Sequence, residues 1–504
     1  MTNPATQTSN GGNHVDVLIV GAGLSGIGAA THLQNNCPGK SYTILEARDA
    51  IGGTWDLFKY PGIRSDSDMF TLGYNFRPWE DDKSIADGPT ILNYIRDTAK
   101  EMKVEDNIRF NHKVRHAAWS TQTARWTITA ERTDTGETVE YTANFMFMAS
   151  GYYNYDAGYT PDFEGTEDFK GRIVHPQKWT DDIDYAGKKV IVIGSGATAV
   201  TLVPEMAKTA EHVTMLQRSP TYMGSVPAKD KLANKLRDLL PAKVAYAMTR
   251  WRKILFGLGF FNFSRSRPEV VKKVLLKGVS AQLKDQSLVE KHFTPSYNPW
   301  DQRLCAVTDG DLFKMINKGK ATVVTDHIDR FNETGILTKG GEQLDADLII
   351  TATGLDLQMF GGMTCDVDGA PIAFNETYAY KGMMFSGVPN FAQAFGYTNA
   401  SWTLKCDLTC AYVCRLINHM DAKGLDYCVP EQNDPNFKEE AFLDFSSGYV
   451  QRAAGTLPKQ GAEAPWKVYQ NYFKDKKALG KGKLEDDVMT WGTATGEEAK
   501  LAAE

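Results

Sequence analysis

Short apolar runs, several of them rich in β-branched residues, recur along the chain, and a glycine closely follows each one. The runs span residues 15–20, 145–148, 188–193 and 348–351. Continuous apolar runs of this length are typical of parallel strands that are buried on both faces. A helical stretch that extends to Leu33 follows the first run. The pattern therefore predicts an α/β fold with buried parallel strands.

The glycines after the first run form a dinucleotide-binding signature. Gly21, Gly23 and Gly26 have the spacing Gly-x-Gly-x-x-Gly, between the predicted strand and the predicted helix. In this signature the first glycine forms a tight turn, the second lets the backbone approach a pyrophosphate, and the third packs helix against strand. The pyrophosphate would bind N–H groups at the helix start, that of Ser25 included. A second predicted strand ends at Glu46, where an acid that binds the ribose hydroxyls is expected.

A second signature of the same kind follows the run at 188–193. Its residues are Gly194, Ser195, Gly196, Ala197, Thr198 and Ala199. Alanine is an accepted residue at the third position. The next predicted strand is followed by Arg218 and Ser219, where a site for NAD would place an acid. Because the planar guanidinium of Arg218 suits a 2′-phosphate, the signature favours NADPH over NADH.

Composition narrows the class of protein. The chain has 504 residues, 42% of them hydrophobic, enough for two or three domains with sizeable cores. Its net charge of −6 gives no general reason to expect nucleic acid as a partner. No apolar run reaches the length of a transmembrane helix, and residues 1–14 lack the apolar core of a signal peptide.

Cysteine usage points to a reducing compartment. Seven cysteines show no disulfide framework, so we expect a cytoplasmic protein. We expect a helix at about 403–421, and three of the cysteines, at 406, 410 and 414, are spaced to share one face of it. We expect these thiols to pack in a core and not to bind metal.

Residues 231–280 have the opposite charge balance. They contain twelve Lys or Arg and two acids, which gives +10 within a chain of −6. Four phenylalanines between 256 and 263 lie inside this basic stretch. Such a segment is typical of a surface that associates peripherally with membranes, or of a funnel for an anionic cofactor. A solvated helical insertion with a packed aromatic face explains the same pattern, so the sequence leaves these interpretations open.

The segment between the two signatures carries a family resemblance. Residues 169–179 read Phe-Lys-Gly-Arg-Ile-Val-His-Pro-Gln-Lys-Trp. The spacing of Phe169, Gly171, His175 and Trp179 resembles the fingerprint of type I Baeyer–Villiger monooxygenases, whereas the related flavin-containing monooxygenases usually end it in Tyr or Phe. The resemblance extends over about residues 14–484. Several long runs of the sequence resemble the corresponding runs in mycobacterial members of the family. It implies two Rossmann-like dinucleotide-binding domains, for FAD and NADP, with a helical insertion.

The same resemblance implies domain limits. The FAD-binding domain would take residues 1–155 and 356–504, and the NADP-binding domain residues 156–224 and 301–355. The helical insertion would take residues 225–300.

A second family motif is matched by residues 52–66, Gly-Gly-Thr-Trp-Asp-Leu-Phe-Lys-Tyr-Pro-Gly-Ile-Arg-Ser-Asp. By resemblance, the FAD site adds to the first signature Thr54, Trp55, Asp56, Leu57, Asp66 and the backbone of Val114. Arg64 and Ser65 would face the nicotinamide. Phe58 is a departure, since members that oxidise cyclic ketones often have a polar residue there.

The catalytic residues implied by the resemblance are Arg303 and Asp66. Arg303 ends the run Asn-Pro-Trp-Asp-Gln-Arg, and Asp66 would orient it. Some relatives carry a lysine where this chain has Gln302, so its preference for NADPH would be weaker than theirs.

The resemblance implies an FAD- and NADPH-dependent enzyme that inserts one oxygen atom of O2 into ketones to give esters, through a flavin C4a-peroxide, and also oxidises sulfides. The alternative is a flavin-containing monooxygenase that oxidises only nitrogen or sulfur, and Trp179 and Arg303 argue against it. A disulfide or ferredoxin reductase would need a redox-active cysteine pair or an iron–sulfur partner, and no Cys-x-x-Cys lies near the motifs. A nucleotide-binding sensor without activity is a third option, disfavoured by the intact catalytic pair.

Overall fold

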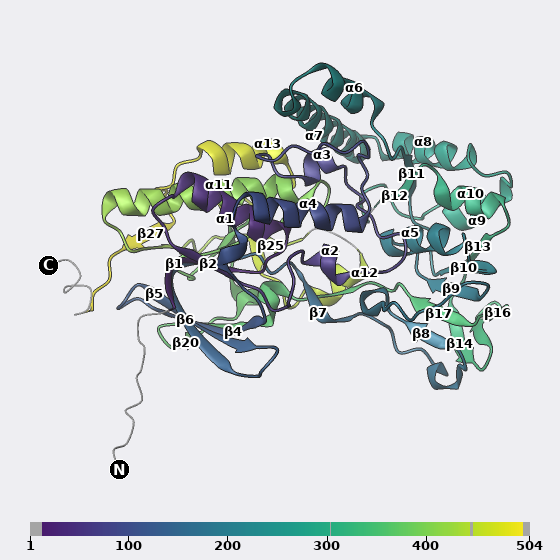
Figure 1. Cartoon of the computed structure of the whole chain (residues 1–504), viewed down its shortest axis with the longest axis horizontal. Coiled ribbons are helices and arrows are strands. Elements are labelled where there is room, and N and C mark those ends of the chain that lie inside the picture. The colour runs from purple at the N-terminus through teal and green to yellow at the C-terminus, as the bar shows by residue number, and fades with distance from the viewer. Residues whose placement is uncertain (1–12, 303, 444–446, 497–504) are drawn as a thin grey trace, which may run out of the picture.

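The computed structural model describes residues 13–302, 304–443 and 447–496. Its larger sheet has nine strands and is built around the first apolar run (Figure 1). The strand order is β20 (Ala370–Pro371), β19 (Thr364–Val367), β4 (His112–Ser120), β5 (Arg125–Arg132), β6 (Thr138–Met148), β1 (His14–Val20), β2 (Tyr42–Leu45) and β3 (Ile108–Arg109), and β23 (Phe391–Gln393) also pairs with β6. β1 pairs in parallel with β2 and β6. The runs at 15–20 and 145–148 are thus confirmed as neighbouring strands with buried centres.

The smaller sheet has five strands, all parallel. Their order is β13 (Ala321–Thr325), β10 (His212–Gln217), β9 (Lys189–Ile193), β17 (Leu348–Thr351) and β8 (Arg172–Val174). The two remaining apolar runs form β9 and β17, which pair with each other at its centre. The larger sheet is mixed, since β4, β5 and β6 pair antiparallel, and the smaller sheet is parallel. Each sheet bears a glycine turn and a helix after one of its parallel strands, which confirms the predicted fold class, α/β with two Rossmann-like folds.

Helices follow the strands as the periodicity predicts. α1 (Leu24–Asn36) follows β1, and α5 (Ala197–Met206) follows β9. α11 (Trp402–Lys423), expected at about 403–421, packs beside α1. The three cysteines of α11 are buried, as predicted.

Further elements of the chain are mostly short helices and strands. They are α2 (Thr54–Leu57), α3 (Met69–Leu72), α4 (Gly88–Glu101), α10 (Asp311–Asn317), α12 (Gly448–Ala453), α13 (Tyr472–Asp475), β14 (Ile328–Asn332), β15 (Gly335–Thr338), β16 (Gln343–Asp345), β21 (Ala379–Tyr380), β22 (Met384–Phe385), β24 (Tyr427–Pro430), β25 (Glu439–Ala441), β26 (Lys459–Gly461) and β27 (Met489–Gly492).

The basic segment folds as helices between β11 (Met223–Val226) and β12 (Cys305–Thr308), two strands that pair in parallel. These helices are α6 (Lys231–Leu239), α7 (Ala242–Ser266), α8 (Pro268–Ser280) and α9 (Ser287–Phe293). α6 and α7 lie at the upper edge of the molecule in the view of Figure 1. None of the described helices is both long and apolar enough to cross a membrane.

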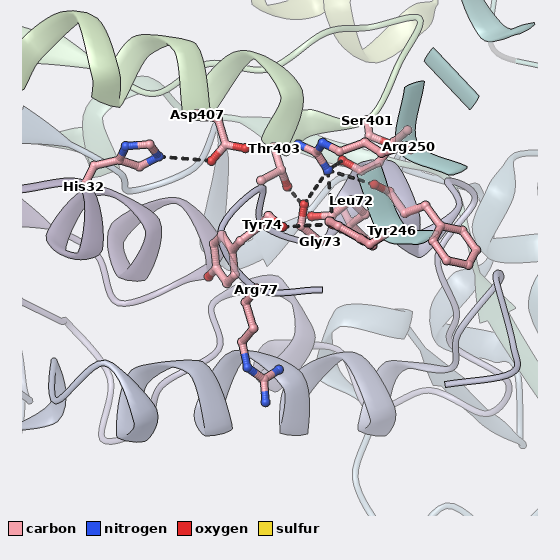
Figure 2. A network of polar contacts seen from close by, with 12 residues as sticks. His32, Leu72, Gly73, Tyr74, Arg77, Tyr246, Arg250, Ser401, Thr403 and Asp407 are labelled. Carbon is pink, nitrogen blue, oxygen red and sulfur yellow. Dashed lines mark hydrogen bonds and ion pairs between the residues drawn. The ribbon is translucent and has the colours of Figure 1, made fainter. Parts of the chain in front are cut away.

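A buried arginine attaches α7 to the domain of the larger sheet (Figure 2). Arg250 is 8% exposed, and its Nη1 donates hydrogen bonds of 2.8 Å to the carbonyls of Phe70 and Gly73. Its Nη2 lies 3.0 Å from the Asp407 carboxylate on α11, and the other oxygen of that carboxylate lies 3.3 Å from Nε2 of His32 on α1. The Arg250 guanidinium therefore holds the insertion to the larger-sheet domain. Its hydrogen bonds to the protein replace those that it would make to water if it were exposed.

Candidate cofactor and active site

At both ends of the first glycine turn, neighbouring backbone atoms leave no room for a side chain. Gly21 has a φ of +105°, and a Cβ there would lie 2.7 Å from the carbonyl oxygen of Ala149. A Cβ on Gly26 would lie 1.9 Å from the carbonyl oxygen of Gly21. Because side chains are excluded here, the start of α1 can approach β1 closely and leave its first N–H groups available to a pyrophosphate.

Glu46 lies behind this turn at the end of β2. Its Oε2 accepts the N–H of Ala22 at 2.7 Å, and its Oε1 accepts the N–H of Arg48 at 2.9 Å. Burial raises the pKa of the Glu46 carboxyl. Glu46 thus occupies the position at which the sequence predicts a ribose-binding acid. Its carboxylate also stabilises the glycine turn through the hydrogen bond from Ala22.

The second glycine turn has a closed end and an open middle. Gly194 has a φ of +135°, and a Cβ there would lie 2.4 Å from the carbonyl oxygen of Ala352. Around Gly196, by contrast, no atom of the described residues lies within 4 Å of an added Cβ. Ser195 Oγ donates to the Ser219 carbonyl at 3.2 Å, which places Arg218 and Ser219 beside the turn. Arg218 is exposed. The open backbone and the exposed guanidinium fit a nucleotide that carries a 2′-phosphate.

A cavity of about 320 Å³ reaches both turns. Residues 23–25 of the first turn form part of its wall, and Ala197, Thr198 and Thr201 on α5 form another part. Aromatic side chains line much of the rest, namely Trp55, Phe58, Tyr60, Tyr152, Tyr153, Tyr155, Tyr397 and Trp402. The flat, mostly apolar walls suit a planar flavin ring, and contact with both turns lets a nicotinamide meet it there.

Most residues predicted from the 52–66 motif lie at this cavity. Thr54, Trp55, Ser65 and Asp66 line it. Arg64 also lines it, and its Nη1 lies 2.5 Å from Asp311 Oδ2 at the start of α10. That ion pair with α10 orients the Arg64 side chain.

Apart from the glycine turn and Glu46, three residues predicted to bind FAD do not line this cavity. Asp56 is buried and bridges Arg48 at 2.6 Å and Arg96 at 2.9 Å. Leu57 packs against the core under the larger sheet, and the Val114 side chain is buried in β4. For Asp56 and Leu57 the structure therefore shows a scaffolding contact behind the cavity, because α2 turns their side chains away from it.

Arg303 lies outside the described residues, but the segment before it is described. The ring of Trp300 lies 5.4 Å from that of Phe261 on α7, centroid to centroid. Asp301 Oδ1 lies 2.7 Å from Arg265 Nη1, also on α7. The insertion therefore holds the loop that leads to the predicted catalytic arginine.

The fingerprint segment lies where the chain crosses between the two sheets. β7 (Tyr153–Gly158) and β18 (Leu355–Leu357) are the two crossing segments, and they pair antiparallel. His175 Nε2 lies 3.1 Å from the carbonyl of Gly354, and its Nδ1 accepts the N–H of Gln177 at 3.2 Å. A Cβ on Gly158 would lie 2.0 Å from the His175 ring. His175 thus sits between both crossing segments as a neutral ring with its hydrogen on Nε2.

The other fingerprint residues fix the ends of this segment. Phe169 is 8% exposed, in a core cluster beside the smaller sheet. A Cβ on Gly171 would lie 2.4 Å from the carbonyl oxygen of Asp347. Trp179 contacts Tyr185 edge to face at 6.1 Å between centroids. All four fingerprint residues therefore fix the course of the chain between the two sheets, and none of them lines the cavity.

The neutral His175 ring predicts a pH dependence of stability. Burial lowers the pKa of His175, whereas an unfolded histidine titrates near 6.5. The ring therefore contributes stability above about pH 6.5, and this is lost as the pH falls through the lower folded pKa, because the unfolded chain then binds more protons. In urea titrations between pH 7.5 and 5, His175→Gln should lose less stability than the wild type. The exposed His327→Gln should follow the wild type, and an identical pH profile for His175→Gln would contradict this assignment.

Several cavity residues were not predicted from the sequence. Trp402 donates its indole N–H to Ser25 Oγ at 3.1 Å, and its ring stacks on Tyr152 at 4.9 Å. Tyr153 shares a short hydrogen bond with Thr54. The aromatic run at 152–155, directly after the glycine at the end of a buried strand, is the signal that could have indicated Tyr152 and Tyr153.

Comparison with known proteins decides the family. The FAD-containing monooxygenase EthA of Mycolicibacterium smegmatis is 53% identical over 477 residues, which cover 94% of this chain and 96% of EthA. The chain is a member of the FAD-containing monooxygenase family. The monooxygenase is also 53% identical over 475 residues to EthA of Mycobacterium tuberculosis, and 49% identical over 485 residues to a probable FAD-binding monooxygenase, AlmA, of Acinetobacter baylyi. The predicted family and its first cofactor, FAD, are confirmed.

Solved structures agree on the fold of the monooxygenase. A steroid monooxygenase bound to NADP superimposes with a TM-score of 0.74 at 24% identity, covering 95% of this chain and 99% of that one. An open form of cyclohexanone monooxygenase gives 0.74 at 18% identity, covering 96% and 100%. Residues 18–238 also match the family model described as pyridine nucleotide-disulphide oxidoreductase.

Proposed function

We propose that this monooxygenase is a Baeyer–Villiger enzyme that uses NADPH, FAD and O2 to convert ketones to esters and also oxidises sulfides. The balanced reaction takes ketone, O2, NADPH and a proton to ester, NADP⁺ and water. The observation that supports this most is that one cavity reaches both glycine turns and has Asp66 on its wall. Solved structures with this fold include one of cyclohexanone monooxygenase with cyclohexanone bound and one of a steroid monooxygenase with NADP bound.

The residues of the chain have separable tasks in this proposal. FAD, when bound, takes a hydride from NADPH and then activates O2. Arg303 would supply a fixed positive charge to the oxygen-bearing anion without donating a proton, because a guanidinium stays protonated in proteins. Asp66 would orient that guanidinium from the cavity wall. The aromatic walls would exclude water, which would otherwise protonate the anion.

The alternative is a monooxygenase that oxidises only nitrogen or sulfur. Incubation of the FAD-loaded enzyme with NADPH, O2 and either an aliphatic ketone or an aryl alkyl sulfide separates the two, with products identified by mass spectrometry. Ester from the ketone, with one atom from ¹⁸O2, supports the proposal. Sulfoxide without any ester from a series of linear and cyclic ketones would favour the alternative, and hydrogen peroxide alone would exclude both.

We propose that Arg218 selects NADPH by binding its 2′-phosphate. Arg218→Ala should raise KM for NADPH by a factor that corresponds to about 2–3 kcal/mol of lost charge-assisted hydrogen bonding, and should change KM for NADH little. Arg218→Lys is the matched control, because it keeps the charge and loses only the planar fork. Steady-state kinetics with both nucleotides provides the measurement, and an equal effect on the two would refute the assignment.

We also propose the domain limits given by the resemblance and a cytoplasmic location. The five strands of the smaller sheet all lie between Arg172 and Thr351, on both sides of the insertion, which supports an NADP-binding domain in two parts. All seven cysteines are free thiols, which supports a reducing compartment.

A further inference from the structure

The exposed apolar side chains are concentrated in one place. Among the described residues, ten of the eleven large apolar side chains that are exposed lie between residues 232 and 274, on α6, α7 and α8. They are Leu232, Leu239, Val244, Met248, Trp251, Leu255, Phe256, Phe263, Val270 and Val274. Isolated exposed apolar residues are normal on any protein, but a concentration of this kind marks a binding surface.

α7 presents apolar side chains on two different faces. Tyr246, Arg250 and Ile254, spaced four residues apart, are buried. The opposite stripe is open to solvent, with exposed fractions of 47%, 50%, 38% and 56% for Val244, Met248, Trp251 and Leu255. This spacing of four, three and four residues places all four on one side of a helix. A helix that only covered its own domain would have polar residues on that side.

The C-terminal part of the chain extends the same surface. The eleventh exposed apolar side chain, Phe473 on α13, stacks on Trp251 with 6.2 Å between ring centroids and 22° between planes. Lys476 Nζ lies 4.2 Å from the centre of the Trp251 ring. α6, α7, α8 and α13 lie along the upper edge of the molecule in Figure 1. We call the surface formed by these four helices the docking surface.

The docking surface is strongly basic, and many of its lysines are not neutralised by an ion pair with a carboxylate of the described residues. Some of its bases face acids of the chain, such as Arg237 with Asp82 and Arg252 with Asp230. Other lysines have no carboxylate within ion-pair distance in the described parts of the chain, namely Lys231, Lys235, Lys243, Lys272, Lys273, Lys277, Lys474 and Lys477. The segment 471–483 adds five lysines and one aspartate to the +10 of residues 231–280. The remainder of the chain is correspondingly acidic, since the total is −6.

We propose that the docking surface binds an anionic lipid bilayer, with the stripe of α7 and Phe473 inserted among the acyl chains and the lysines on the headgroups. Apolar side chains bordered by lysines are the pattern of interfacial helices, and anionic lipid supplies the complementary charge. A second copy of this chain fits the same surface poorly, because two such basic faces would repel each other. The buried Arg250 network fixes α7 to the larger-sheet domain, so the whole enzyme follows α7 to the membrane.

The test is co-sedimentation of the FAD-loaded enzyme with vesicles of phosphatidylglycerol and phosphatidylcholine. We expect binding to phosphatidylglycerol vesicles at low salt, release as salt rises, and little binding to pure phosphatidylcholine. The triple variant Lys235→Glu, Lys243→Glu, Lys273→Glu removes one exposed lysine from each of α6, α7 and α8, and should lower the partition coefficient by about a hundredfold or more. The double variant Leu255→Ser, Phe256→Ser should keep a weaker binding that salt abolishes completely, because the charges remain but the insertion is lost.

The matched control is Lys170→Glu, Lys339→Glu. Both lysines are exposed and lie beside β14–β16, where no large apolar side chain is exposed among the described residues. This variant should bind like the wild type, and circular dichroism and FAD content should be unchanged in every variant. Failure of the wild type to bind anionic vesicles at low salt overturns the proposal, as does an equal loss in the control. A dimer that Leu255→Ser, Phe256→Ser converts to a monomer would also overturn it, since the surface would then belong to a second copy.

Discussion

Arg303→Ala is expected to consume NADPH and O2 while it makes almost no ester. FAD should still bind, because the turn at Gly21 and the brace at Glu46 are untouched. Oxygen insertion should fall by about 10²–10³, the usual cost of removing one preorganised group at a developing anion. Hydrogen peroxide should appear in place of product, because the oxygen-bearing anion is no longer stabilised. Parallel assays of NADPH oxidation, peroxide and ester provide the measurement.

Two companion variants sharpen this experiment. Asp66→Asn keeps the shape of a side chain on the cavity wall but removes its charge. It should lower ester formation less than Arg303→Ala does, because the guanidinium is present but less well oriented. Arg64→Ala tests the neighbouring cation that pairs with Asp311, and should mainly alter nucleotide binding. Near wild-type ester yield from Arg303→Ala would show that this arginine is not the catalytic one.

Arg250→Met should lower the free energy of unfolding by about 3–5 kcal/mol. Removal of one partner of a buried ion pair leaves the other charge uncompensated, and that cost exceeds the value of the pair itself. Here Asp407, with a side chain 7% exposed, would lose its cation, and the carbonyls of Phe70 and Gly73 would lose a donor. Urea titration at pH 7 provides the free energy. The double variant Arg250→Met, Asp407→Leu should recover part of it, because the uncompensated carboxylate is then gone as well.

Arg252→Met is the control on the same helix. The Arg252 side chain is 38% exposed, and its partner Asp230 keeps a second cation, Lys253, at 2.9 Å. Solvent-exposed pairs contribute about 0–1 kcal/mol, so we expect a small effect. FAD retention should fall in Arg250→Met, since α3, whose Phe70 carbonyl accepts a hydrogen bond from Arg250, carries Leu72 on the cavity wall. Equal effects of the two arginine variants would show that burial of Arg250 contributes nothing.

The strands and the glycine turns could be predicted from the sequence because their causes are local. The run at 188–193 is apolar from Val190 to Ile193, and such a run is typical of a strand that is covered on both faces. Gly21 and Gly194 follow such runs directly, and their positive φ values show why no other residue suits these turns. α11 could be placed to within two residues of its observed ends for the same reason.

Which groups face one another was decided only by the tertiary structure. The motif that carries Asp56 indicates a loop at the cofactor, but the orientation of α2 turns Asp56 to Arg48 and Arg96. The pairs Arg250–Asp407 and Trp251–Phe473 join residues that are 157 and more than 200 positions apart, so no local pattern specifies them. Composition showed that the insertion is basic and aromatic, but it could not show which face of α7 the protein covers. The covered face is the one that carries Arg250, whose guanidinium donates hydrogen bonds to carbonyls of the larger-sheet domain in place of water. The positions of those carbonyls are set by the packing of the whole domain.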